Sequence, residues 1–252
     1  MPTYIQNEEV NLIVPEIRIT APPTEKPASA DSQWSRWLVV VVYAIAMAWM
    51  ESAVVLYLRK MMNRIDPYQT PPMIPIGGVA FAEVVREAAT MVMLLAVGCL
   101  AGRTWRNRLG YAFIAFGIWD IFYYVFLMPL SGWPNGLLDW DLLFLIPLPW
   151  WGPVLAPVLI ALLMILWGTL ASQYEGATYR LREWPLWLPT LSGVVLALYV
   201  FMADALRVVP EGLTAVSQML PVSFNWPLFS LALLLMSAPV WKELRHRAWQ
   251  WI

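Results

Sequence analysis

Six long apolar runs limit most strongly how this chain can fold. They cover residues 37–58, 79–101, 109–130, 142–171, 186–206 and 224–240. An α-helix crosses the hydrocarbon core of a bilayer with about 20 apolar residues, and it satisfies its backbone hydrogen bonds within the segment. The runs therefore predict an all-α integral membrane protein with six transmembrane helices.

Composition supports the membrane class and narrows the partners. Of the 252 residues, 60% are hydrophobic and 13% are charged, whereas about 25% are charged in an ordinary soluble domain. Many of the 16 tryptophans stand beside Pro, Arg or Gly at the ends of the runs, where an amphipathic ring suits the headgroup region. The lipid bilayer is the expected surrounding. The formal net charge of -1 argues against nucleic acid as a partner.

The scarcity of three residue types excludes several cofactors. Cys99 is the single cysteine, so this chain cannot hold a cysteine zinc site or an iron–sulfur cluster on its own. His246 is the single histidine, which excludes a bis-histidine haem in the membrane. Lys26, Lys60 and Lys242 lie outside the apolar runs, which excludes a retinal Schiff base in the bundle. Carboxylates, hydroxyls, aromatic rings and arginines remain as ligand-binding groups.

Three regions follow from the pattern. Residues 1–35 form a Pro-rich extended tail, residues 36–240 the transmembrane bundle, and residues 241–252 an amphipathic segment at the membrane surface. Within the tail, residues 10–19 read VNLIVPEIRI, which is apolar and β-prone. We expect this stretch to lie on other membrane-protein subunits, and a disordered tail is the alternative.

The fourth run is longer than one span requires. Its first half contains Pro147, Pro149, Pro153 and Pro157. Each proline removes a backbone donor and clashes with the preceding turn. We therefore expect a Pro-broken helix, or a re-entrant segment that leads into a regular helix from about Pro157. A kinked helix after a long entry loop is the alternative.

Lysine and arginine set the expected orientation. One side holds Arg18, Lys26, Arg36, Arg103, Arg106, Arg108, Arg180, Arg182, Lys242, Arg245 and Arg247, and the other holds Arg59, Lys60, Arg64 and Arg207. Because cytoplasmic loops carry the excess of positive charge, this 11 to 4 distribution predicts that both termini are cytoplasmic. The expected location is the inner (cytoplasmic) membrane of a bacterium.

With this topology, the acidic residues fall in the outer half and the middle of the bilayer. The candidate binding site comprises Glu51, Glu83, Arg86, Glu87, Asp120, Tyr123, Tyr124, Asp139 and Asp141. A charge at bilayer depth is costly unless it is paired or hydrated, so the deep carboxylates should face the bundle interior. Arg86 can pair with Glu83, three residues earlier. Glu51, Glu87 and Asp120 then lack positive charge, which protons or a bound cation must supply.

Two interpretations of these carboxylates remain open. Carboxylates without histidine or cysteine favour hard divalent cations such as Mg²⁺, Ca²⁺ or Mn²⁺, and Glu51, Glu87 and Asp120 would be the ligands. Alternatively, protonated carboxyls and one ion pair hold the helices together.

Two classes of function are compatible with these features. The first is a non-catalytic accessory or scaffold subunit of a larger membrane complex, with the acidic and aromatic pocket in the outer half of the bilayer. The second is a carboxylate-based cation or proton-coupled transporter, or a membrane-embedded enzyme that acts on a lipid-soluble substrate. The sequence favours the subunit by a small margin, because the tail and the indole-rich surfaces suit docking.

Overall fold

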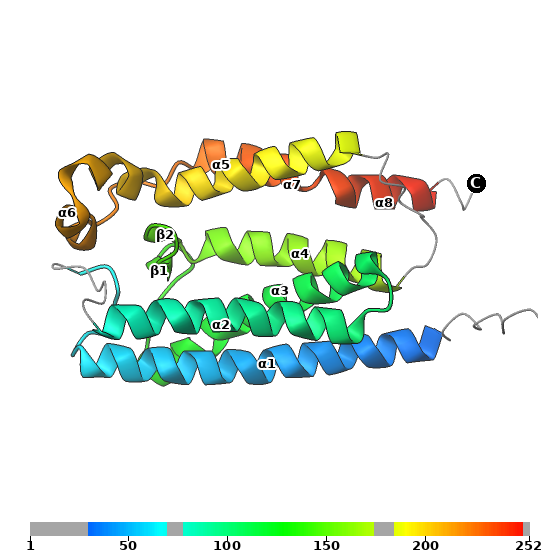
Figure 1. The fold of residues 1–252 in the computed structure, drawn as a ribbon, viewed down its shortest axis with the longest axis horizontal. Coiled ribbons are helices and arrows are strands. Elements are labelled where there is room, and N and C mark those ends of the chain that lie inside the picture. Colours follow the sequence, from blue (N-terminus) through cyan, green and yellow to red (C-terminus); the bar gives the residue numbers. More distant parts are fainter. Residues whose placement is uncertain (1–29, 70–77, 174–183, 249–252) are drawn as a thin grey trace, which may run out of the picture.

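Helices form most of the chain in the computed structural model, which describes residues 30–69, 78–173 and 184–248 (Figure 1). The long helices are α1 (Ala30–Met61), α2 (Gly78–Ala101), α3 (Trp105–Ser131), α4 (Leu155–Gln173) and α5 (Trp184–Val208). The shorter elements are strands β1 (Trp140–Phe144) and β2 (Trp150–Pro153), the 3₁₀ helix η2 (Val209–Glu211), and helices α6 (Leu213–Gln218), α7 (Trp226–Met236) and α8 (Ala238–Ala248). The partner-binding stretch expected at residues 10–19 lies outside the described residues.

Five helices, α1 to α5, are long and apolar enough to cross a membrane, and α7 with α8 makes a sixth candidate. Their outward faces carry large apolar side chains, among them Val39, Leu95 and Leu100, which are 68%, 55% and 86% exposed. A soluble protein rarely leaves such a surface in contact with water. The helices therefore fit a multi-pass membrane protein whose outer surface faces lipid.

Helix α3 is the centre of the bundle, where it packs against α1, α2 and α4. Small residues allow this close approach. A Cβ atom added at Gly98 on α2 would lie 2.6 Å from the backbone nitrogen of Ala112, and one added at Gly168 on α4 would lie 2.5 Å from the carbonyl oxygen of Gly110. Backbone contact between helices of this kind is typical of membrane bundles, where small residues replace the hydrophobic driving force.

The first half of the fourth apolar run forms two short strands and their connection, where the sequence led us to expect a Pro-broken helix or a re-entrant segment before a regular helix. Strands β1 and β2 pair as an antiparallel hairpin in which Asp141 lies opposite Gly152. Pro147 and Pro149 lie in the connection between the strands, where a missing backbone donor costs no ladder hydrogen bond. The regular helix that was expected from about Pro157 begins at Leu155.

The sixth apolar run is bent. Helices α7 and α8 meet at an angle of 41° on either side of Ser237. Pro239 stands just after the break, and proline has no N–H to continue the helical ladder. Helix α8 therefore begins at Ala238, within the expected sixth span, and includes most of the segment that we had assigned to the membrane surface.

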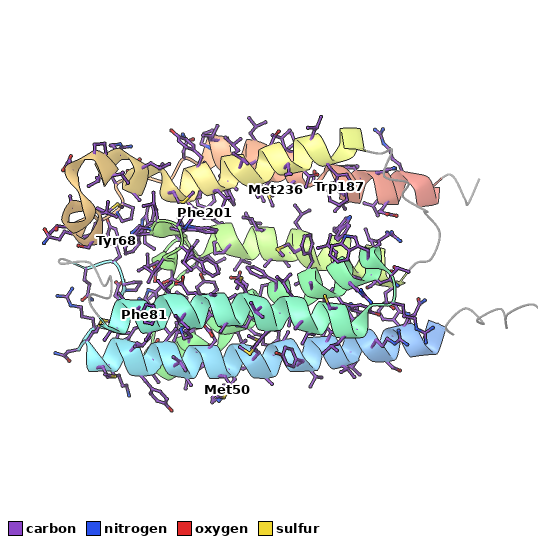
Figure 2. The ribbon with its side chains drawn as sticks, in the orientation of Figure 1. Met50, Tyr68, Phe81, Trp187, Phe201 and Met236 are labelled. Atoms are coloured by element: carbon purple, nitrogen blue, oxygen red, sulfur yellow. The ribbon has the colours of Figure 1, made fainter. Side chains whose placement is uncertain are left out.

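The bundle has two distinct ends (Figure 1). The hairpin and α6 lie at one end, and the start of α1 lies with α8 at the other. After α1, the chain crosses toward α6: Tyr68 stacks on Trp140 with 5.9 Å between ring centroids, and its hydroxyl donates to the carbonyl of Pro221 at 3.1 Å (Figure 2). Helix α5 packs along α7, and Phe201 on α5 lies next to the hairpin (Figure 2). The hairpin thus lies where α4 and α5 meet, and β2 contacts both helices.

Candidate functional site

A cavity of about 170 Å³ lies between the helices at the hairpin end of the bundle. Its charged and polar lining consists of Glu51, Arg59, Glu83, Arg86, Glu87, Thr90, Asp120, Tyr123, Tyr124 and Asp141. Its aromatic lining consists of Phe116, Trp119, Phe144, Trp150 and Phe201. Helices α1 to α5 and the hairpin each contribute to the wall, so the cavity exists only when the whole bundle is assembled.

Arg86 joins two helices at the edge of this cavity. Its guanidinium pairs with Glu51 on α1 and with Glu83 on its own helix, where Nε donates to Glu83 Oε2 at 2.9 Å. Glu51 also accepts a weak hydrogen bond from the hydroxyl of Thr90 at 3.4 Å. The sequence predicted the pair within α2, and the structure adds the pair across to α1.

Glu87 connects α2 to the hairpin. Both of its carboxylate oxygens accept from the backbone N–H of Leu145, at 3.2 and 3.1 Å. Leu145 follows β1, where the strand pairing ends, so its N–H has no ladder partner and needs another acceptor. Glu87 therefore holds the hairpin against the cavity.

Arg59 and Asp141 form a buried ion pair in the wall of the cavity. Arg59 Nη2 lies 3.1 Å from Asp141 Oδ1, and both side chains are only 3% exposed. Arg59 also donates a hydrogen bond to the carbonyl of Ile65 at 3.0 Å, and its guanidinium lies 4.1 Å from the ring centroid of Trp133. The hydroxyl of Tyr124 donates a hydrogen bond to Asp141 at 3.2 Å. This network links α1, α3 and the hairpin.

The pKa of Asp141 is higher than that of an ordinary aspartate despite this network. Burial raises the pKa of Asp141 from 3.8 to about 6, although Arg59 and the Tyr124 hydroxyl both favour the ionised form. The desolvation of the carboxylate therefore outweighs the attraction of its partners.

Asp120 differs from the other carboxylates in the wall because one of its oxygens has no hydrogen-bond partner among the described residues. Its Oδ2 atom is buried without a hydrogen bond to any described residue, and the whole residue is 8% exposed. The indole nitrogens of Trp119 and Trp150, which also line the cavity, are likewise buried without an acceptor in the described part of the chain. Among the described residues of the cavity wall, Asp120 Oδ2 is thus the one carboxylate oxygen that is buried without a hydrogen bond. The buried donors without one are the two indole nitrogens, Arg59 Nε and Arg86 Nη1, and the last of these is in the ion pair with Glu51.

Most of the predicted site residues meet in this cavity. Glu51, Glu83, Arg86, Glu87, Asp120, Tyr123, Tyr124 and Asp141 all line it. Asp139 does not: it lies in the loop before β1 and accepts from the backbone N–H groups of Asn135 and Gly136, at 2.7 and 3.4 Å. Asp139 therefore stabilises a turn.

The sequence interpretation left Arg59 out of the candidate site and counted it among the cations on the side opposite the termini. A signal was present, because Glu51, Val55 and Arg59 recur every fourth residue and share one face of α1. That face carries the cavity, so a residue in register with Glu51 points into the same wall.

The geometry gives little support to the metal site considered from the sequence. In the ranges that the structure describes, no group of three or more acidic, histidine or cysteine side chains is arranged to hold a metal ion. The Arg86 guanidinium stands between Glu51 and Glu83 and supplies positive charge there, where a cation would otherwise be required.

Comparison with known protein families, with curated proteins and with solved structures gave no match. Function is therefore inferred from the chemistry of the cavity.

Proposed function

We propose that this protein binds a small lipid-soluble molecule in the cavity at the hairpin end of the bundle, and that Asp120 is the group that contacts it. The single observation that carries the proposal is the unpartnered Oδ2 atom of Asp120 in the cavity wall. A buried polar atom without a hydrogen bond is costly, so its presence calls for a functional reason.

The neighbouring carboxylates make the contrast clear. Each of the other four acidic residues in the wall has a cation or a backbone N–H as its partner: Glu51, Glu83, Glu87 and Asp141. Those four suffice to hold the helices and the hairpin together. Helix packing therefore explains them and leaves Asp120 without a structural role.

The composition of the wall suits such a ligand. Aromatic and aliphatic side chains supply most of the surface, and a few polar groups converge on it, as in most small-molecule sites. A carboxyl group in contact with a bound molecule can exchange a proton with it. That step is common to the proton-coupled transporter and to the acid–base enzyme that the sequence allowed.

The accessory-subunit function stays a prediction. It depended chiefly on the tail, most of which lies outside the described residues. Purification in mild detergent followed by mass determination tests it, because stoichiometric co-purifying proteins would support a subunit and a lone monodisperse species would argue against one.

The variant Asp120→Asn tests the binding function. Asparagine has nearly the same shape as aspartate, and Asp120 Oδ2 has no partner to lose, so the variant should insert and fold as the wild type does. We expect organic extraction and mass spectrometry of the purified protein to reveal a small molecule that accompanies the wild type and is lost from Asp120→Asn.

The matched control is Asp204→Asn. Asp204 lies outside the cavity, where it pairs with Arg207 at 3.1 Å and accepts from the N–H of Val222 at 3.2 Å. This variant should retain the bound molecule. An identical small-molecule profile for the wild type, Asp120→Asn and Glu87→Gln would leave helix packing as the sole role of these carboxylates.

A further inference from the structure

We infer that the ligand of this cavity is a small organic cation, an amine with an apolar body about the size of one ring. This inference rests on the proposed function and adds the charge and the size of the molecule. It combines the charge balance of the wall, the aromatic rings around Asp120 and the volume of the cavity.

The wall contains more carboxyl groups than cationic groups. Five carboxylates and two guanidinium groups line the cavity. Arg59 pairs with Asp141, and Arg86 pairs with Glu51 and Glu83. Among the described residues, no cation is paired with the two remaining carboxylates. Both are largely buried: Glu87 is 7% exposed and Asp120 is 8% exposed.

The two remaining carboxylates are not equivalent. Glu87 is stabilised by the N–H of Leu145, whereas the Oδ2 atom of Asp120 has no donor in the described residues. A protonated amine would supply both the missing donor and the missing positive charge at Asp120. A carboxylate or phosphate ligand would instead add a negative charge to a buried acidic wall, which is strongly unfavourable.

The aromatic rings favour the same charge. Trp119 and Trp150 line the cavity with Asp120, and an indole face attracts a cation within about 6 Å of its centroid. A cation–π contact of this kind already occurs in the structure, where Arg59 lies 4.1 Å from the ring centroid of Trp133. The free N–H groups of the two cavity indoles need an acceptor, which a hydroxyl or ether oxygen on the ligand supplies without a negative charge.

The volume of the cavity limits the size of the part of the ligand that it can enclose. A cavity of about 150 Å³ takes one benzene ring, and this cavity has about 170 Å³. One ring therefore fits in the cavity, which Ile160, Phe201 and Asp120 all line.

Three probes with one ring and different charges test the inference. Phenethylamine is a cation, 2-phenylethanol is neutral and phenylacetate is an anion at pH 7. Binding to the full chain in lipid nanodiscs is measured by the shift in thermal unfolding, with empty nanodiscs as the blank for partitioning. We expect phenethylamine to bind at least about tenfold more tightly than 2-phenylethanol, and phenylacetate to bind least.

Two variants and one control locate the binding. Asp120→Asn should remove the tenfold preference for the amine, and Asp204→Asn should keep it. Ile160→Phe adds bulk to the wall without changing charge and should weaken all three probes, so it decides the result if Asp120→Asn does not fold. Amine binding that survives Ile160→Phe, or a preference that survives Asp120→Asn, would overturn the inference.

The outcomes separate this inference from the proposed function. If 2-phenylethanol or phenylacetate binds as tightly as phenethylamine and Ile160→Phe weakens it, the cavity binds small molecules and the cationic class is wrong. If none of the probes binds the wild type at millimolar concentration, both the cationic class and the small-molecule function fail.

Discussion

Arg59 and Asp141 stand 82 positions apart in the sequence and form a buried ion pair. The two residues differ in how many other favourable contacts they would keep if the pair were broken. Arg59 also donates a hydrogen bond to the carbonyl of Ile65 and makes a cation–π contact with the ring of Trp133. Asp141 has no other cation within hydrogen-bond distance among the described residues, although Tyr124 donates to it. At the residue scale, stability should therefore respond more to the loss of the arginine than to the loss of the carboxylate charge.

Replacing Arg59 tests this asymmetry. Arg59→Met removes the cation that pairs with Asp141, so the buried carboxyl must either bind a proton or stay ionised without a counter-charge, which costs up to about 3 to 5 kcal/mol. Asp141→Asn should cost clearly less, because Arg59 keeps its other partners. The double variant should recover most of the stability that Arg59→Met loses. Unfolding in a series of SDS mole fractions measures all three, and equal losses for the two single variants would contradict the asymmetry.

The pKa of Asp141 predicts a pH dependence with a definite sign. Burial raises the pKa of Asp141 from 3.8 to about 6, so between these pH values the folded protein binds this proton and the unfolded chain does not. The contribution of Asp141 to the free energy of unfolding is therefore complete below about pH 4 and is lost as the pH rises to about 6.

The difference between wild type and Asp141→Asn isolates this contribution from that of other carboxyls. We expect the wild type to lose stability relative to Asp141→Asn as the pH rises from 4 to 6. In Arg59→Met the loss should extend to higher pH, because the guanidinium no longer favours the ionised form. A pH-independent difference would contradict the assignment.

At the scale of the elements, α3 and α4 approach each other through glycine. A Cβ atom at Gly168 would lie 2.5 Å from the carbonyl oxygen of Gly110 and 2.9 Å from Cγ1 of Ile114. Backbone cannot move aside as a flexible side chain can.

The variant Gly168→Ala tests this packing. It should destabilise the bundle by about 1 to 3 kcal/mol through overpacking, although alanine is the better helix former by about 1 kcal/mol. Gly136→Ala is the control, because a Cβ atom there meets nothing within 4 Å. Thermal unfolding in detergent compares the two. A Gly168→Ala protein as stable as the wild type would mean that the helices can separate without cost.

For the whole molecule, the two ends of the bundle correspond to the two sides of the expected topology. The start of α1 and helix α8 lie at one end, and the hairpin and α6 lie at the other (Figure 1). Arg59 is buried and is not a loop residue, so we expect it to contribute less to the loop charge of its side than the sequence count assumed.

Reporter fusions test the orientation. We expect reporters placed after Ile252 and before Trp34 to read as cytoplasmic, and a reporter inserted near Asn135 to read as external. An external signal at the C-terminus would reverse the orientation and place the cavity on the cytoplasmic side.

The helices were the easiest part to predict, and the physical reason is local. A chain in hydrocarbon must satisfy its backbone hydrogen bonds within each segment, so runs of about 20 apolar residues indicate α1, α2, α3 and α5 without reference to the rest of the chain. The pair between Glu83 and Arg86 followed in the same way from their spacing on one helix.

The remaining features depend on contacts between distant segments. The hairpin forms because residues 140–153 pair with each other and because Glu87 accepts from Leu145, and proline spacing alone does not distinguish this from a broken helix. Arg59 could be assigned to a loop or to the core until Asp141 was placed beside it. That Asp120 Oδ2 lacks a partner among the described residues depends on the position of every neighbouring donor, because an unused acceptor is a property of its surroundings and not of its own residue type.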